Sequence, residues 1–295
     1  MTHVVVLGCG YVGCELARQL DDHHVVGVRR SADGLAAVEA AGAEPVRADV
    51  TDPDSLASVP DADWLVFAAS AGGRDVAAAR ETYVTGLRTA IEHFDGRDDS
   101  PDRLVYTSST GVYGDHDGAW VAEDTPLSPA TEKTRVLAEA EQIALDIPDG
   151  IDGTVARFGG LYGPDRYRLE RYLEGPVTAG YLNMVHRDDA AGAIAFLLQS
   201  DAGRDAVVNV VDDEPVEKWG FADWLAEQCD EPFPPKQTIE ERLTGEDDES
   251  SRRISANKRV SNDRLATLGY EFAYPTYREG YRAAIEAYKT GELDD

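Results

Sequence analysis

A glycine-rich turn between a valine-rich strand and a helix constrains this chain more than any other feature. Residues 3–7 read HVVVL, a short apolar run typical of a strand covered on both faces. Gly8, Gly10 and Gly13 follow as G-x-G-x-x-G, and residues 14–20 predict a helix. Such glycines allow a tight turn, close approach of the backbone to a pyrophosphate and close helix–strand packing. Because a helix N-terminus also attracts phosphate, the sequence predicts that a dinucleotide binds here.

The end of the second predicted strand, HVVGVRRS, bears on the choice of cofactor. An acidic residue there would accept a hydrogen bond from the ribose 2′-hydroxyl of NAD and repel a 2′-phosphate. The chain has Arg29 and Arg30 instead, and guanidinium groups bind phosphate in a bidentate manner. We therefore predict NADP as the cofactor, with NAD still possible. The open alternative is that both arginines form surface ion pairs with nearby acids.

Strand and helix patterns alternate through the first half of the chain. After the second strand, AEPVRADVTDPDSLASV predicts a strand and then a helix capped near Asp52, with Pro53 at its first position. Further strands are predicted in residues 63–73, 102–114 and 152–164, and helices over 81–94 and 131–145. Repeated units of this length predict an α/β fold with a doubly wound parallel sheet, in which ligands bind beyond the carboxyl ends of the strands.

Several further motifs resemble one known family over nearly the whole chain. They are GCGYVG, ADVTD, VYTSSTGVYG, ARFGGLYGP, MVHRDDAAGAI, NVVDDEP and SNDRLATLGYEFAYPTYREG. The chain resembles the extended branch of the short-chain dehydrogenase/reductase superfamily, the NAD-dependent epimerases and dehydratases. The resemblance implies a Rossmann domain in residues 1–157, to which 186–212 return. It also implies a smaller C-terminal substrate lobe in 158–185 and 213–295, which in this family often recognises nucleotide-linked sugars.

The motifs and the strand ends together predict which residues contact the cofactor. They are Gly8, Gly10, Tyr11, Val12, Gly13, Arg29, Arg30, Asp49, Val50, Ala68, Ala69, Ser108, Arg135 and Phe158. Asp49 and Val50 close the third strand, where they would bracket the adenine. The small residues from Ala68 onward would let the cofactor pass close over the end of the fourth strand.

The resemblance implies a catalytic hydroxyl but departs from the family at the proton carrier. Ser109, five residues before the glycine of V-Y-G, would hold a substrate hydroxyl or carbonyl oxygen. The family's Tyr-x-x-x-Lys pair aligns with Thr131 and Arg135. A threonine hydroxyl is too weak an acid to carry protons near neutral pH, and arginine stays charged. This departure resembles the atypical members of the extended branch, and the absence of an Asp–Glu pair in STGVYG argues against 4,6-dehydration.

Three other side chains are weaker candidates for the missing proton carrier. Tyr113 and Tyr162 follow strand ends, and His186 lies in the VHRDD segment. For each, packing or anchoring of the chain is the simpler interpretation. Arg157 is expected to order the turn or the cofactor. The sequence thus leaves two functions open: an enzyme with non-standard proton transfer, or a non-catalytic sensor of NADP(H).

Charge and cysteine content bear on partners and compartment. The formal net charge of −28, with a pI near 4.4, argues against nucleic acid and anionic membranes as partners. Acidic residues occur along the whole chain, a pattern that resembles proteins of salt-loving organisms. The sparse Cys9, Cys14 and Cys229 predict buried filler rather than disulfides or a metal site. With no evident signal peptide or membrane span, we expect a cytoplasmic protein that acts on a small molecule, and an oligomer is possible.

The C-terminal part predicts two helices, a strand and a loop. VHRDDAAGAIAFLLQ and EKWGFADWLAEQC predict the helices, with Trp219, Phe221 and Trp224 in the core, and DAVVNVVDDEP predicts the strand between them. The charge-dense EERLTGEDDESSRRIS predicts a mobile loop, either a solvated surface loop or a lid over the substrate.

Overall fold

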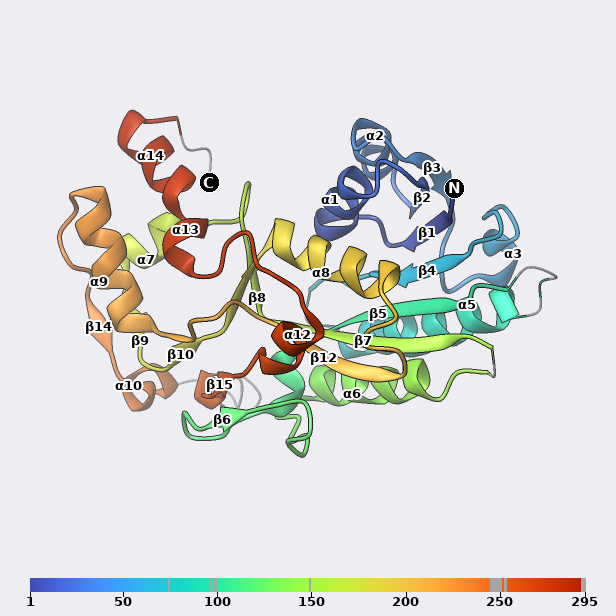
Figure 1. The fold of residues 1–295 in the computed structure, drawn as a ribbon. Helices are drawn as coiled ribbons and strands as arrows, with labels where there is room; N and C mark the ends of the chain where they lie inside the picture. The colour runs from blue at the N-terminus through green and yellow to red at the C-terminus, as the bar shows by residue number, and fades with distance from the viewer. Residues whose placement is uncertain are drawn as a thin grey trace. The chain divides into compact units, whose positions relative to one another are not determined.

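A seven-stranded sheet with the order β12-β7-β5-β4-β1-β2-β3 forms the centre of the fold (Figure 1). The computed structural model describes residues 1–73, 75–95, 97, 100–148, 150–244, 251 and 254–292. The strands are β1 (His3–Leu7), β2 (His24–Arg29), β3 (Glu44–Arg47), β4 (Trp64–Phe67), β5 (Arg103–Ser109), β7 (Asp152–Phe158) and β12 (Ala206–Val210). β1 pairs in parallel with β2 and β4, β2 with β3, and β4 with β5. Because the strand order reverses beside β1, the predicted doubly wound α/β sheet is confirmed.

Helices cover both faces of this sheet. They are α1 (Tyr11–Gln19), α2 (Ala32–Ala40), α3 (Pro53–Leu56), α4 (Val76–Arg80), α5 (Gly86–Asp95), α6 (Glu132–Leu145) and α8 (Arg187–Gln199). Figure 1 shows α5 and α6 along one face and α1 and α8 along the other. Val4 to Leu7 of β1 are fully buried, which explains why that strand is apolar throughout rather than alternating. Asp52 caps α3 and Pro53 starts it, as the sequence predicted.

The helix predicted over residues 81–94 is longer and less regular than expected. It begins at α4, where Asp75 accepts hydrogen bonds from the Ala77 and Ala78 amides, and passes through a π-helical turn (η1, Glu81–Thr85) into α5. At Gly86 a Cβ atom would lie 2.9 Å from Val50 Cγ2. The glycine therefore lets α5 pass close to the segment that follows β3.

The chain divides into two compact units. The first contains 1–109, 132–157 and 190–208, and the second contains 110–131, 158–189 and 209–295. This division differs from the expected domains chiefly at 110–131, which belong to the second unit. The reason is strand pairing, since β6 (Trp120–Val121) pairs in parallel with β15 (Arg259–Val260), a partner far away in the sequence.

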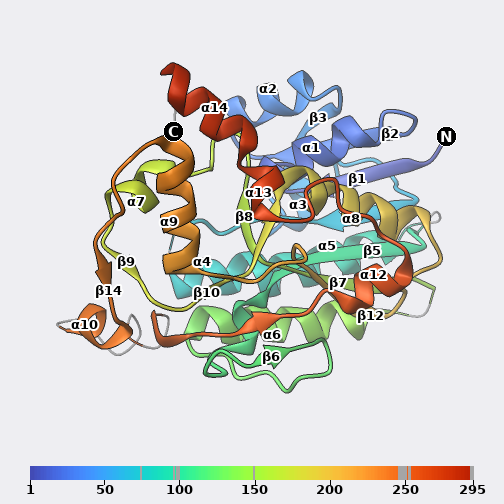
Figure 2. The ribbon, with the colours of Figure 1, turned by 60° about the vertical axis from the view of Figure 1, so that its left-hand side comes forward.

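The second unit is built from short elements. Its strands are β6, β8 (Gly160–Tyr162), β9 (Val177–Thr178), β10 (Tyr181–Leu182), β11 (Met184–His186), β13 (Val216–Glu217), β14 (Lys236–Gln237) and β15. Its helices are η2 (Thr110–Tyr113), α7 (Leu169–Glu174), α9 (Lys218–Cys229), α10 (Ile239–Leu243), α12 (Asp263–Leu268), α13 (Tyr277–Gly280) and α14 (Arg282–Thr290). Figure 2 shows α9, α13 and α14 lying together, in agreement with their contacts.

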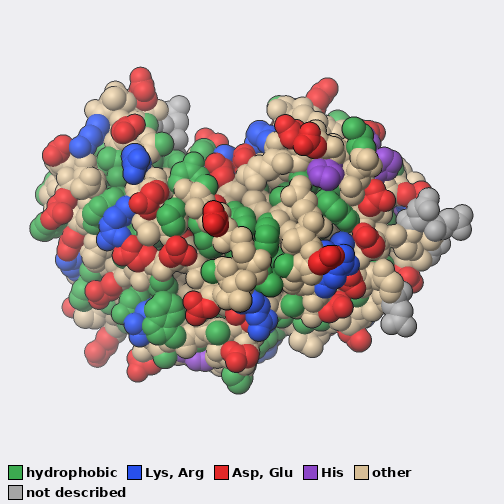
Figure 3. Space-filling view, viewed as in Figure 1, with side chains coloured by type: hydrophobic (Ala, Val, Ile, Leu, Met, Phe, Trp, Pro, Cys, Tyr) green, Lys and Arg blue, Asp and Glu red, His purple; other side chains and the backbone are tan. Residues whose placement is uncertain are grey.

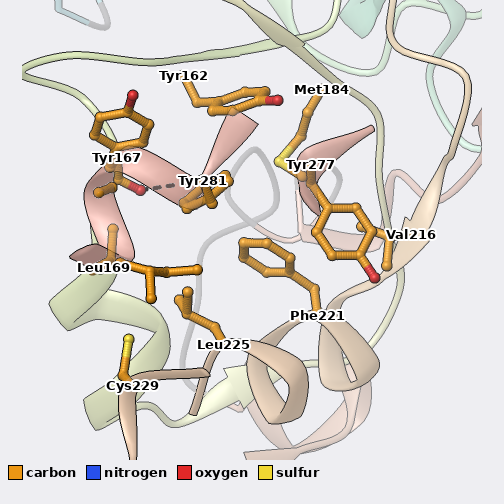
Figure 4. Packing of buried hydrophobic residues seen from close by; sticks show 12 residues of the cluster. Tyr162, Tyr167, Leu169, Met184, Val216, Phe221, Leu225, Cys229, Tyr277 and Tyr281 are labelled. Carbon is orange, nitrogen blue, oxygen red and sulfur yellow. Dashed lines mark hydrogen bonds between the residues drawn. The ribbon is translucent and has the colours of Figure 1, made fainter. Parts of the chain in front are cut away.

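An aromatic cluster forms the core of the second unit (Figure 4). Tyr162 stacks on Tyr281 with ring centroids 4.8 Å apart, and Phe221 packs edge-on against the same Tyr281 ring. Of the three aromatic residues predicted as core in α9, Phe221 is fully buried, whereas Trp219 and Trp224 are only half-buried. The half-buried Trp219 donates its indole N–H to the carbonyl of Val177 at 2.8 Å, so its polar edge is satisfied at the rim of the core.

The loop predicted over residues 240–255 falls largely on 245–250 and 252–253, which lie outside the described residues. Its beginning is helical. Thr238 caps α10, and the Glu241 side chain accepts a hydrogen bond from the Thr238 amide in return. Local capping therefore orders the first part of a segment that its composition marked as a loop.

Surface charge and cysteine placement follow the composition. Figure 3 shows acidic side chains spread over the visible face of the molecule rather than collected at one end. Cys9, Cys14 and Cys229 are all buried. Within the described ranges, no helix has both the length and the apolar character needed to cross a bilayer.

A buried ion pair ties helix α6 to the sheet of the first unit. The Arg157 guanidinium donates two hydrogen bonds to Glu141, at 3.0 Å to Oε1 and 2.7 Å to Oε2, and Ser108 Oγ donates a third at 2.6 Å. Both charged side chains are almost fully buried. Two residues away on the same helix, Glu139 forms a similar bidentate pair with Arg80 at the surface.

Replacing Glu141 or Glu139 alone tests how strongly burial changes the contribution of each ion pair to the free energy of unfolding. We expect Glu141→Leu to lower the free energy of unfolding by about 3–5 kcal/mol, because it leaves Arg157 buried without a counter-charge. Glu139→Leu should cost less than about 1 kcal/mol, since Arg80 is solvated. Urea unfolding followed by circular dichroism measures both, and equal losses would contradict the argument. The double variant Glu141→Leu/Arg157→Met should regain most of the lost stability.

Candidate functional site

The glycine-rich turn after β1 is held by close packing of the backbone. Gly8 has φ +85°, and a Cβ on it would lie only 2.3 Å from Ala69 Cα. Its N–H and that of Cys9 both donate to the carbonyl of Val28. The turn is therefore fixed between the ends of β2 and β4, and only glycine fits at its first position.

Helix α1 starts directly from this turn, with Gly10 as its N-cap. The N–H groups of the first helical turn have no acceptor within the helix, and the helix dipole is positive at this end. Among the described residues, the side chain nearest to a Cβ on Gly10 would be that of Arg29, with its Nη1 at 2.5 Å. This backbone can therefore accept the pyrophosphate of a dinucleotide.

The two adjacent arginines have different surroundings. Arg30 pairs with Asp49 at 3.3 Å, as the surface-pair interpretation required. Arg29 lies between Gly10 and Gly34 and has no ion pair within the part of the chain that the structure describes. An unpaired guanidinium beside the glycine turn, in a chain with 56 acidic residues, fits a bound phosphate.

A third arginine joins this region and was missed from the sequence. Arg47 is paired with Arg29 across the β2–β3 ladder, and its Nη1 donates to the carbonyl of Arg30 at 2.8 Å. The signal was available in principle. Arg47 ends the third strand, which pairs with the second strand in the sheet.

Asp49 and Val50 follow β3, as predicted. Burial alone would raise the pKa of the Asp49 carboxyl, but hydrogen bonds from Thr51 and Arg30 outweigh it and lower that pKa below its ordinary value. Asp49 is therefore ionised at neutral pH. It serves as the counter-charge of Arg30, and Val50 is buried beside it.

The comparisons with known proteins agree with this geometry. A family model described as NAD(P)H-binding matches residues 8–201, a range that begins at the glycine turn. The chain belongs to this NAD(P)H-binding family. Solved structures of the NAD-dependent epimerase/dehydratase superfamily share its fold over nearly their whole length.

Three proteins similar to this chain have different names and sources. Protein YeeZ of Escherichia coli strain K12 is 33% identical over 213 residues, which is 69% of this chain and 75% of YeeZ. A 3-diazoavenalumate denitrifying reductase of a Streptomyces species is 28% identical over 273 residues, covering 75% of this chain and 86% of the reductase. The structure of a conserved protein of unknown function from Silicibacter pomeroyi matches with a TM-score of 0.77 and 30% identity over 99% of both chains.

The two serines at the end of β5 in this NAD(P)H-binding protein have different environments. Ser108, expected to contact the cofactor, is buried and its hydroxyl donates to Glu141. Its side chain therefore serves the core of the first unit. Ser109 is half-buried and is the last residue of the strand, and consecutive strand residues point to opposite faces. The Ser109 side chain therefore points away from the face on which Ser108 meets Glu141.

The residues in place of the Tyr–Lys pair provide no titratable phenol. Thr131 is buried just before α6 begins at Glu132. Arg135, one turn into the helix, forms an ion pair with Glu132. Lys133 donates to the carbonyl of Gly73 at 2.9 Å. None of these three residues at the start of α6 therefore carries a phenol, and the loss of the Tyr–Lys pair stays a prediction from the sequence.

The other candidate proton carriers lie in the second unit and are engaged there. The Tyr113 hydroxyl donates to Asn209 Oδ1 at 2.8 Å. His186 is 2% exposed, its Nδ1 accepts from the Asp188 amide at 3.2 Å, and its ring lies against Tyr274. These contacts anchor the chain, so they favour a packing or anchoring role for Tyr113 and His186 over a role as proton carrier.

Tyr162 is the third of these weaker candidates, and its placement argues against a role as proton carrier. It is 2% exposed within the aromatic cluster (Figure 4), and its hydroxyl oxygen has no hydrogen-bond partner among the described residues. Burial, with the nearby Asp212 carboxylate adding to it, raises the pKa of the Tyr162 phenol far above its ordinary value. The strand-end position was visible in the sequence, but the ring turns into the core.

The remaining expected contacts are placed as follows. Ala68 continues the β4–β1 ladder through its N–H to the carbonyl of Leu7 at 2.8 Å. Phe158 is buried at the end of β7, and Arg157 before it serves Glu141 rather than a turn. Among the described residues, no group of three or more His, Cys, Asp or Glu side chains could hold a metal ion.

Two glycine variants separate folding from binding at this turn. Gly8→Ala should lower stability by on the order of 3 kcal/mol, because its methyl meets backbone at a positive φ. Gly10→Ala meets only the end of a flexible side chain, so it should fold normally and yet bind NADPH at least roughly tenfold more weakly. Thermal unfolding and calorimetric titration measure the two effects. A Gly10→Ala protein that binds NADPH as tightly as the parent would contradict this placement of the pyrophosphate.

Proposed function

We propose that this protein is an NADP(H)-dependent oxidoreductase of the epimerase/dehydratase type, acting on a small carbonyl or nucleotide-sugar-type substrate with non-standard proton transfer. The observation that carries the proposal is the unpaired Arg29 guanidinium over the glycine turn. It supplies a charge that a 2′-phosphate needs and that a 2′-hydroxyl does not.

The surroundings of Arg29 support NADP over NAD. No acid ends β2, and Asp49, which follows β3, is already held by Thr51 and Arg30. Arg47 adds a second positive charge across the ladder. A 2′-phosphate at this place would gain two guanidinium partners, whereas NAD would leave them without an anion.

In the reaction, the chain's own residues would bind the cofactor and orient the substrate. The bound nicotinamide supplies or accepts hydride. The first turn of α1 would hold the pyrophosphate, and Arg29 the 2′-phosphate. Ser109 would hydrogen-bond the substrate oxygen, as the equivalent hydroxyl does in the family. Similarity to a Streptomyces protein named as a reductase supports reductive chemistry.

The second candidate is a non-catalytic NADP(H) sensor. It is favoured by the set Thr131, Arg135, Tyr113, Tyr162 and His186, each of which is buried, engaged or unsuited to carry a proton. An oxidoreductase without a protein acid must take its proton from water or from a group that the substrate itself brings. A sensor has no such need.

Isotope transfer from labelled NADPH distinguishes the two functions. The protein is incubated with [4-²H]NADPH and a panel of aldehydes, ketones and nucleotide sugars, at low and at high potassium chloride. The proposal expects deuterium in a product, lost in Ser109→Ala and retained in Ser109→Thr. Tight NADPH binding with no transfer to any substrate would favour the sensor.

The choice of cofactor is tested by the two neighbouring arginines. Arg29→Ala should weaken NADPH binding roughly 10- to 100-fold, because a hydrogen bond to a charged group is lost, and should leave NADH binding unchanged. Arg30→Ala is the matched control and should have a smaller effect, since Arg30 is held by Asp49. Calorimetry measures the NADPH and NADH affinities of the parent protein and of each variant. Equal NADPH and NADH affinities in the parent would overturn the assignment of NADP.

A further inference from the structure

Of the five lysines in the protein, two are buried or half-buried within the second unit, and these two lie close to one another. Lys258 is 7% exposed, and Lys218, the first residue of α9, is half-buried. A Cβ on Gly180 would lie 3.4 Å from Lys218 Nζ and 3.1 Å from Asn257 Oδ1. The Lys218 amine and the side chain of Asn257, the residue before Lys258, therefore both pack close to the Gly180 backbone.

Neither of these two lysines forms an ion pair with the described residues, although the Asp115 carboxylate attracts Lys258 from a longer range. The surface lysines Lys236 and Lys289 form ion pairs with Asp223 and Asp230. By contrast, neither Lys218 nor Lys258 forms an ion pair across the described ranges. Lys258 Nζ donates only to a neutral group, the carbonyl of Gly114, at 3.1 Å.

The charged groups around the two amines act in both directions. Burial lowers the pKa of Lys258 to about 8; Asp115 opposes this shift, and the smaller effect of Lys218 adds to it. Burial and Arg171, on α7, lower the pKa of Lys218 as well. Placing two cations close together in a part-buried site without an ion pair costs stability. In a chain with 56 acids against 28 bases, such a cluster needs a reason.

We propose that Lys218 and Lys258 form an oxyanion subsite that binds a carboxylate or phosphate group of the substrate. This inference rests on the proposed function and narrows its substrate to an anionic one. The oxyanion would supply the missing ion-pair partner, and Asn257, whose Oδ1 accepts from the Tyr181 amide, would orient the Lys218 side of the site.

Anion titration of the full-length protein tests the subsite. Thermal stability and calorimetry are recorded with inorganic phosphate and with malonate, against chloride at matched ionic strength. We expect saturable binding of at least one probe. The tighter probe then identifies phosphate or carboxylate as the preferred group. Lys218→Met and Lys258→Met should each weaken that binding at least tenfold, and the control Lys289→Met, with the same change of charge at the surface, should not.

The pH dependence of anion affinity distinguishes a role of Lys258 in binding the anion from a purely structural role. Parent affinity should fall as pH rises through about 8, approaching tenfold per unit above it, because the neutral Lys258 amine no longer attracts the anion. Lys258→Arg keeps its charge, so it should retain binding at pH 9 and lose this dependence. That variant also keeps the test valid should a methionine variant fail to fold.

Two outcomes would overturn the proposal. One is the absence of saturable binding of either probe, and the other is equal weakening in Lys289→Met. NADPH titration of the same proteins is run in parallel. Normal NADPH binding without anion binding removes the subsite and leaves the proposed function standing, whereas loss of NADPH binding in the parent removes the proposed function.

Discussion

Close packing of Gly8 against the end of β4 is the contact on which the cofactor-binding end of the sheet depends. A side chain at this position would collide with the Ala69 backbone, so the turn after β1 can pass between its two neighbouring strands only as bare backbone. Because Gly8 packs so closely against Ala69, helix α1 begins at the edge of the sheet, and its first turn faces outward. The order of strands on either side of β1 then determines which side chains surround that turn.

The unpaired cations are the informative charges in this acidic chain. With twice as many acids as bases, many arginines and lysines meet a carboxylate, as Arg30, Arg80, Lys236 and Lys289 do. Arg29, Lys218 and Lys258 form no ion pair with the described residues. We propose that each instead meets an anion that arrives with a ligand, a cofactor phosphate in the first unit and a substrate group in the second.

Burial separates structural from chemical roles among residues that look alike in the sequence. Ser108 and Ser109 are neighbours, yet one belongs to a buried ion-pair network and the other ends the strand. Glu139 and Glu141 both meet an arginine in the same geometry, one in solvent and one in the core. Tyr162 follows a strand end, as a catalytic residue would, but its ring completes an aromatic core.

The sequence alone determined the alternation of strands and helices, the doubly wound sheet and the glycine turn, because these depend on local pattern and spacing. Tertiary structure decided which residues share an environment: Arg47 beside Arg29, Lys258 beside Lys218, and residues 110–131 in the second unit. Each of these depends on pairing between segments far apart in the chain. Local periodicity carries no information about such pairing, since any of several partners would bury the same apolar face.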